Sequence, residues 1–201
     1  MPSPLASWTD EALAAEARAG SSACFEVLVE RYQVRLNRFL LRSLNQHDAE
    51  DVVQDAFVQA YLNLSRFDPK YRFKTWLFVI AQRLMIDRLR KKRPMVDVEE
   101  IDVAKHENPH DRVLSDERSS VLWKVAKREL SDEAYRAMWL HYVEEMGTVE
   151  VAKVLKRSWV WVKTTLHRSR RKLAPHVRSL VDVVEDRRVG FSPPTGTDAV
   201  G

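Results

Sequence analysis

The stretch DAEDVVQDAFVQAYLNLSRFDP, residues 48–69, contains two sets of side chains at helical spacing. The apolar set recurs every three or four residues without a gap, as on a helix that packs one face against a core. This set consists of Ala49, Val52, Val53, Ala56, Phe57, Ala60, Tyr61 and Leu64. We therefore predict an amphipathic helix here, and the same periodicity elsewhere in the chain predicts an all-α fold.

The second set lies on the face of this helix that would point to solvent. It consists of Asp51, Gln54, Asp55, Val58 and Leu62. Asp48 is expected to cap the helix, and Glu50 is favoured in its first turn by the macrodipole. Asp51 and Asp55 repel each other four residues apart, and an exposed Val58 adds nothing to the stability of a monomer. This set suits a docking surface for a basic partner; an ordinary solvated helix face is the alternative.

The composition limits the classes of protein to consider. With 201 residues, 45% of them hydrophobic, and only 5 glycines, the chain can bury a core and is mostly helical in character. Cys24 is the only cysteine, which excludes an internal disulfide and argues against a cysteine-based zinc site. We find no Gly-rich phosphate loop, metal-ligand cluster or activated nucleophile, so we expect no cofactor and no enzymatic activity. No apolar run reaches about 20 residues and no signal-peptide pattern occurs, so we expect a cytoplasmic protein without membrane insertion.

Charge divides the chain into four parts. Residues 95–117 hold eight acids against two basic residues, whereas residues 151–181 hold nine Lys or Arg and no acid. We predict a helical domain over 1–94, an acidic flexible linker over 95–117, a basic helical domain over 118–180 and a disordered tail over 181–201. The fold is then two small helical domains joined by a linker.

Aromatic and basic residues are mixed in the loop that follows the opening helix. Pro69 marks a turn, and three aromatic residues, Phe67, Tyr71 and Phe73, lie among Arg and Lys. Unpaired bases would suit this loop, because they stack on aromatic rings while cations hold the phosphates. Alternatively, the aromatic side chains plug the core. The helix that follows aligns several charged residues and ends in the basic cluster RLRKKRP, residues 88–94, which suits phosphate.

Two adjacent helices are predicted in the basic region, GTVEVAKVLKR (147–157) and SWVWVKTTLHRSRRKLA (158–174), with a tight turn near Lys156. A short helix, a turn and a longer basic helix form a helix-turn-helix pattern, whose second helix can enter the major groove of DNA. Ser158 stands at the start of that helix, where base contacts arise. The outward residues are Lys163, Thr164, His167, Arg168, Arg170 and Arg171. The alternative is a solvated helix packed against another protein.

The order of these motifs resembles a known bacterial family. DAEDVVQDAFVQAY, FKTWLFVIAQRLMIDRLRKKR and VKTTLHRSRRKL, with an acidic segment before the last, resemble an extracytoplasmic-function (ECF) sigma factor of RNA polymerase. The resemblance covers about residues 10–94 and 118–176. It implies a sigma region 2 domain, then a sigma region 4 helix-turn-helix domain, and a function in transcription initiation.

The resemblance also implies partners and residue roles. Core RNA polymerase would be bound through its β′ clamp helices and its β subunit, and an anti-sigma factor is a further partner. The polymerase-binding residues would be Asp48, Glu50, Asp51, Gln54, Asp55 and Val58. The downstream, minus-ten promoter element, with its unpaired nontemplate strand, would be bound by Arg66, Phe67, Asp68, Lys70, Arg72, Arg83, Asp87, Arg90 and Lys91. The upstream, minus-thirty-five duplex would be bound by Ser158, Trp161, Lys163, Thr164, His167, Arg168 and Arg171.

The helix-turn-helix departs from the family pattern at its turn. LKR and SWVWVK stand where the family usually has Leu-Gly-Ile and Ser-Glu-Gly-Thr-Val-Lys, so Lys156 or Arg157 would have to adopt the left-handed conformation. Trp159 and Trp161 could contact DNA or a protein partner. Two other functions therefore stay open: a helix-turn-helix repressor or activator that works without polymerase, and a sigma-like adaptor that binds only protein.

Overall fold

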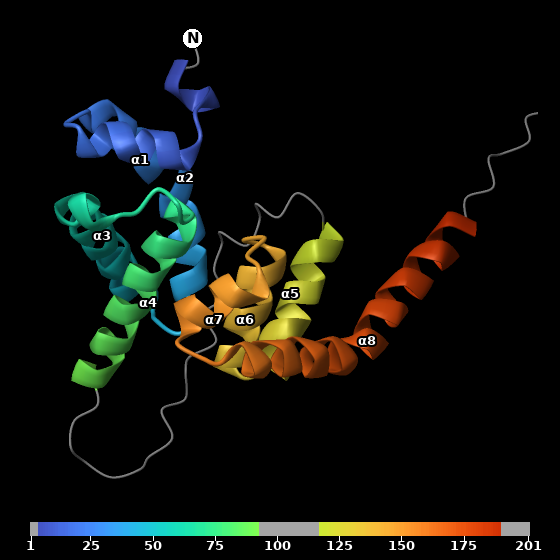
Figure 1. Ribbon diagram of the computed structural model, residues 1–201. Coiled ribbons are helices and arrows are strands. Elements are labelled where there is room, and N and C mark those ends of the chain that lie inside the picture. The colour runs from blue at the N-terminus through green and yellow to red at the C-terminus, as the bar shows by residue number, and fades with distance from the viewer. Residues whose placement is uncertain (1–3, 93–116, 190–201) are drawn as a thin grey trace, which may run out of the picture.

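The computed structural model describes residues 4–92 and 117–189, and this part of the chain contains helices and no strand (Figure 1). The prediction of an all-α fold is confirmed. The elements are η1 (Pro4–Ser7), α1 (Asp10–Arg18), α2 (Ser22–Leu40), α3 (Gln46–Leu62), η2 (Leu64–Arg66), α4 (Phe73–Lys92), α5 (Glu117–Glu129), α6 (Asp132–Tyr142), α7 (Thr148–Leu155) and α8 (Trp159–Val189). We call α1–α4 the first unit and α5–α8 the second unit. The acidic linker predicted over 95–117 lies outside the described residues, except for Glu117.

Short polar side chains set the helix starts. The Thr9 hydroxyl accepts from the Ala12 N–H at 3.2 Å, so Thr9 caps α1. The Asn45 side chain accepts from the Asp48 N–H at 2.9 Å, so α3 begins at Gln46. The prediction that Asp48 caps this helix is therefore wrong, because Asn45 reaches the free N–H first and leaves Asp48 inside the first turn.

The core of the first unit joins all four helices. Its largest fully buried side chains are Leu13, Leu28, Tyr32, Leu36, Phe39, Leu40, Phe73, Leu77, Phe78 and Met85. The predicted apolar stripe of α3 contributes Ala49, Val52, Ala56, Phe57 and Ala60. Tyr61 differs from its prediction: it is about half exposed, and its ring packs edge-to-face against Phe25 at the rim of the core.

The second unit contains the predicted helix-turn-helix. Helix α7 ends at Leu155 and is capped by Lys156, which has the left-handed backbone φ 52° and ψ 45°, and α8 starts at Trp159. Val154, Val162 and Leu166 are buried where the two helices meet. Lys156 thus takes the conformation that the family pattern usually assigns to glycine, as the sequence required.

Helix α8 is longer than the sequence indicated. It continues to Val189 with Pro175 inside it, so the tail predicted to be disordered from residue 181 is helical at its start. Residues 190–201 lie outside the described part. In Figure 1 this helix extends away from the rest of the second unit.

The two units contact each other directly. Helix α7 packs on α4, and Arg35 on α2 donates to Glu144, which follows α6, through Nη2 at 2.6 Å and Nε at 3.0 Å. Thr75 on α4 donates to Glu150 on α7 at 2.6 Å. The corner between α6 and α7 therefore lies against the first unit, close to the start of α4.

Candidate functional surfaces

The solvent-facing set predicted on α3 is largely exposed in the structure. Its exposed members are Gln54, Asp55, Val58 and Leu62, and together with the exposed Glu50 of the first turn we call them the outer stripe of α3. Val58 and Leu62 are exposed apolar side chains directly beyond the acids. This surface can attract a basic partner by charge and hold it by apolar contact.

Asp48 does not belong to this surface. The residue is 3% exposed, and its carboxylate accepts from Arg88 Nε at 3.0 Å and also from the ammonium of Lys92. Arg88 pairs in addition with Asp51 at 2.6 Å, so Asp51 is partly occupied within the first unit. The prediction that Asp48 faces a partner is corrected: this carboxylate anchors the basic end of α4 to the start of α3.

The same contacts change the acidity of Asp48. Burial by itself raises the pKa of Asp48, but the hydrogen bonds and positive charges of Lys92 and Arg88 outweigh burial and hold its pKa below the usual value. The carboxylate therefore remains ionised inside the unit.

The aromatic residues of the loop divide into buried and exposed ones. Phe67 is 4% exposed and packs against Phe73 and Trp76, at 5.6 Å and 5.3 Å between ring centroids. Phe67 therefore fills the core and offers no face for base stacking, which corrects its predicted role. Tyr71, omitted from the predicted set, is 58% exposed. Only the folding of the loop around Pro69 distinguishes the two rings, since both lie among basic residues in the sequence.

The remaining predicted residues of the loop and of α4 are accessible. Arg66, Asp68, Lys70 and Arg72 are exposed in the loop, and Arg83, Arg90 and Lys91 are exposed along α4. Asp87 is half-buried and lies 4.0 Å from Arg83. The Asp68 carboxylate accepts from the Lys70 N–H at 3.0 Å, which shapes the turn that presents Tyr71.

A polar groove of about 600 Å³ lies beside this loop. Tyr71, Lys70, Arg72, Arg31 and Arg35 are among the residues that line it. Asp10, Glu11 and Glu145 also line the groove, and Arg31 and Arg35 are paired with Asp10 and Glu144. Lys70 and Arg72 are therefore the cations that can hold a phosphate while the ring of Tyr71 stacks a base.

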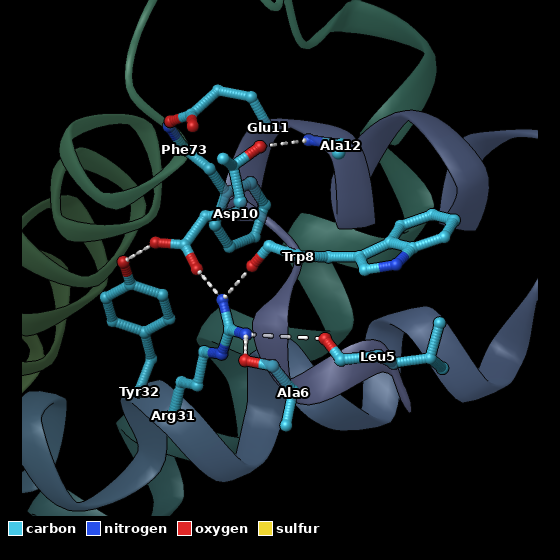
Figure 2. Close-up of polar contacts among 10 residues, drawn as sticks. Leu5, Ala6, Trp8, Asp10, Glu11, Ala12, Arg31, Tyr32 and Phe73 are labelled. Carbon is cyan, nitrogen blue, oxygen red and sulfur yellow. Dashed lines mark hydrogen bonds and ion pairs between the residues drawn. The ribbon is translucent and has the colours of Figure 1, made fainter. Parts of the chain in front are cut away.

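Contacts from the N-terminal segment hold one wall of the groove in place (Figure 2). Arg31 donates to the Asp10 carboxylate at 2.6 Å and to the carbonyls of Ala6 at 2.7 Å and Trp8 at 3.0 Å. Tyr32 also donates to Asp10, and burial together with this carboxylate raises the pKa of the phenol. Sequence periodicity gave no signal for this wall, because its contacts join residues more than twenty positions apart.

Helix α8 presents a basic outer face. Lys163, Thr164, His167, Arg168, Arg170 and Arg171 are exposed, and Val162, Leu166, Ser169 and Leu173 are buried on the other side. Ser158 accepts from the Trp161 N–H at 3.1 Å and caps the helix. Trp161 is half-buried under the guanidinium of Arg157, which lies 5.5 Å from its ring centroid, so this indole is not freely presented. Val160, which is exposed on the outer face, was missing from the predicted set.

Residues 4–92 and 117–189 offer neither a metal site nor a membrane-spanning helix. No group of three or more His, Cys, Asp or Glu side chains there has the arrangement of a metal site. None of the helices in residues 4–92 and 117–189 combines the length and apolar character that a membrane span needs.

Comparisons with known proteins show which family this chain is similar to. Residues 28–94 match Sigma-70 region 2. The ECF RNA polymerase sigma factor SigW of Bacillus subtilis is 34% identical over 179 residues, which cover 82% of this chain and 95% of SigW. The ECF RNA polymerase sigma-E factor of Escherichia coli K12 is 26% identical over 185 residues, covering 86% of this chain and 96% of that protein.

Two solved structures share the fold of this chain. CnrH, solved in complex with the cytosolic domain of CnrY, superimposes with a TM-score of 0.60 at 28% identity, covering 85% of this chain and 97% of CnrH. RpoE of Bartonella quintana, solved with the anti-sigma factor NepR, shares the fold with a TM-score of 0.56 at 21% identity, covering 79% of this chain and 97% of RpoE. The SigW match covers most of both chains, which the repressor and adaptor alternatives do not explain. The chain therefore belongs to the ECF RNA polymerase sigma factors and has the function of an alternative sigma factor in transcription initiation.

Proposed function

We propose that the outer stripe of α3 is the surface of this sigma factor that binds the β′ clamp helices of core RNA polymerase. The observation that carries this proposal is the division of α3 into two faces. Its buried face is complete without Glu50, Asp55 or Val58, so these side chains are available to a partner. Acids followed by apolar side chains fit a partner surface that carries both positive charge and apolar groups.

For the downstream promoter element, we assign base stacking to Tyr71 and phosphate contacts to the cations around it. Lys70 and Arg72 flank the tyrosine in the groove, and Arg83, Arg90 and Lys91 continue the positive charge along α4. An exposed ring beside cations suits an unpaired nontemplate strand, since every base has a face to stack, provided that Lys153 leaves the face of Tyr71 that it covers.

For the upstream element, we assign duplex binding to the outer face of α8. The basic side chains Lys163, Arg168 and Arg171 are exposed, while the helix start is rigidly capped by Ser158. A recognition helix of this kind reads bases from its N-terminal turns and holds phosphates further along.

CnrH and RpoE were both solved bound to a second protein. We infer that an anti-sigma factor also binds this chain and controls its access to polymerase. The exposed apolar side chains Val58 and Leu62 are suited to such a contact.

The test is a charge reversal of Asp55. Asp55→Lys should weaken the binding of core RNA polymerase by about tenfold or more, because it places like charges together at the contact. Asp55 is the better choice than Asp51, whose partner Arg88 lies in the same unit. Binding is measured with purified core enzyme by fluorescence anisotropy of the labelled sigma factor.

Glu30→Lys is the matched control, because Glu30 is also an exposed acid but lies on a different helix, α2. It should leave the affinity unchanged. If the Asp55 and Glu30 variants bind core RNA polymerase with equal affinity, the outer stripe of α3 is not part of the polymerase contact.

A further inference from the structure

Val160 is an exposed apolar residue at the start of the recognition helix. It is 65% exposed and belongs to the first turn of α8. The buried side of α8 is formed by Val162, Leu166, Ser169 and Leu173. By helical spacing, Val160 falls on the opposite line, together with Thr164 and Arg171, which are also exposed. Val160 therefore leads the line of side chains that points away from the domain.

The turn that carries Val160 is held rigidly. Trp159 Nε1 donates to the Thr148 hydroxyl at 2.9 Å, and the ammonium of Lys163 lies 4.1 Å from the centroid of the same indole. The Ser158 hydroxyl accepts from the Trp161 N–H, which fixes the first turn. The helix start thus presents Val160 in one orientation.

These contacts also leave few polar groups for reading bases at this end of the helix. The indole N–H of Trp159 is already donated within the domain, and the ring of Trp161 lies under Arg157. The first turn is apolar at the exposed Val160, and the exposed cations Lys156 and Lys163 lie four residues before it and three residues after it in the sequence. The positive charge near the start of α8 thus favours a polyanion as the binding partner. The exposed side chain of Val160 favours a partner that places an apolar group against it.

Duplex DNA offers one such group in its major groove, the 5-methyl group of thymine. We propose that Val160 recognises a thymine methyl group in the upstream promoter element, with the methyl of Thr164 one turn further along the same line. This inference rests on the proposed function of α8 in duplex binding. It adds a base preference that comes from apolar contact and not from a hydrogen bond.

The experiment replaces thymine by deoxyuridine, which removes only the methyl group. Promoter fragments are first selected from a random pool by the full-length protein assembled with core RNA polymerase. Each thymine of the upstream element, on either strand, is then exchanged for deoxyuridine, and the dissociation constant is measured at fixed salt. At the position read by Val160, the exchange should weaken binding about fourfold, the factor expected for one buried methyl-sized group.

Two variants assign this effect to Val160. Val160→Ala should bind thymine and deoxyuridine fragments equally and should lose the thymine preference in a repeated selection. Val34→Ala changes an exposed valine on α2 in the first unit and should keep the full fourfold difference. Equal binding of both fragments by the unaltered protein, or an undiminished difference in Val160→Ala, would overturn the inference.

A separate experiment tests the proposed function of α8 in duplex binding, on which the role of Val160 rests. Arg168→Ala with Arg171→Ala should weaken all upstream duplexes alike and reduce the salt dependence of binding, because these cations would contact phosphates. If this double variant binds as the unaltered protein does, α8 is not the duplex-binding helix and both proposals fail. If it binds weakly but deoxyuridine has no effect anywhere, only the role of Val160 fails.

Discussion

Phe67 and Tyr71 are two aromatic residues four positions apart that have different environments. Phe67 lies between Phe73 and Trp76 inside the first unit, whereas Tyr71 is exposed and has the ammonium of Lys153 4.4 Å from its ring centroid. One ring therefore stabilises the fold, and the other is available for recognition once Lys153 moves away.

Alanine substitutions should separate these two roles. Phe67→Ala should lower the free energy of unfolding by about 3–5 kcal/mol, because it leaves a cavity among packed rings. Tyr71→Ala should change that free energy by less than about 1 kcal/mol, yet weaken binding of a single-stranded promoter oligonucleotide by about 1–3 kcal/mol. Urea unfolding and fluorescence anisotropy measure the two quantities. Unchanged oligonucleotide affinity in Tyr71→Ala would exclude this ring as the stacking residue.

Asp48 connects the stability of the first unit to pH. Its pKa is below the usual 3.8, since hydrogen bonds from Lys92 and Arg88 outweigh its burial. A carboxyl group with a lowered pKa in the folded state stabilises the protein fully above its ordinary pKa, and this contribution is lost as the pH falls through the lower folded value.

Asp48→Asn should therefore be less stable than the unaltered protein near neutral pH, by about 1–3 kcal/mol, and the difference should shrink below about pH 4. Urea unfolding as a function of pH measures it. A stability difference that stays constant down to pH 2 would show that the charge of Asp48 is not responsible.

At the level of elements, the turn between α7 and α8 contains a strained residue. Lys156 has a positive φ of 52° that side chains adopt at a cost of about 1–2 kcal/mol, whereas glycine adopts it freely. The strain is confined to one residue, and the two helices that flank it pack through Val154, Val162 and Leu166.

Lys156→Gly should raise the stability of the second unit by up to about 1 kcal/mol, because the folded backbone is relieved more than the unfolded chain gains freedom. Thermal unfolding measures the change. Glu26→Gly, in the exposed interior of α2, should instead lower stability by about 1 kcal/mol. If Lys156→Gly lowers stability as much as Glu26→Gly does, the backbone of Lys156 is not strained.

Over the whole molecule, a buried acid connects the two units. Glu144 is 1% exposed and pairs with Arg35, and its carbonyl oxygen accepts from the ammonium of Lys74. Burial together with the nearby Arg35 lowers the pKa of Lys74. Because Lys153 from the second unit also covers Tyr71, the arrangement of the units determines how much of the aromatic loop is accessible.

Reversing the charge at Glu144 should separate the units. Glu144→Lys places a third cation beside Arg35 and Lys74, so the radius of gyration from small-angle X-ray scattering should increase relative to the unaltered protein. Glu30→Lys is the control, because Glu30 is an exposed acid on α2 that does not line the groove beside Arg35 and Lys74. An unchanged radius of gyration in Glu144→Lys would show that this ion pair does not hold the units together.

The sequence by itself determined the helical class of the fold, the positions of most helices and the functional class of the chain. Apolar spacing predicted α3 and the helix-turn-helix, and the separation of the acidic and buried faces of α3 followed from spacing alone. These properties are local, because they depend on residues within one or two turns of each other.

Only the tertiary structure decided which side chains of the candidate surfaces are available. Asp48 is withdrawn from the outer stripe of α3 by Arg88 and Lys92, forty positions away in the sequence, and Phe67 is withdrawn from the loop by the rings of α4. Val160 is exposed because the packing of α7 against α8 turns Val162 inward and leaves Val160 opposite. The sequence gives the charge and aromatic character of each side chain. Its accessibility depends on packing between residues far apart in the sequence, which local spacing does not predict.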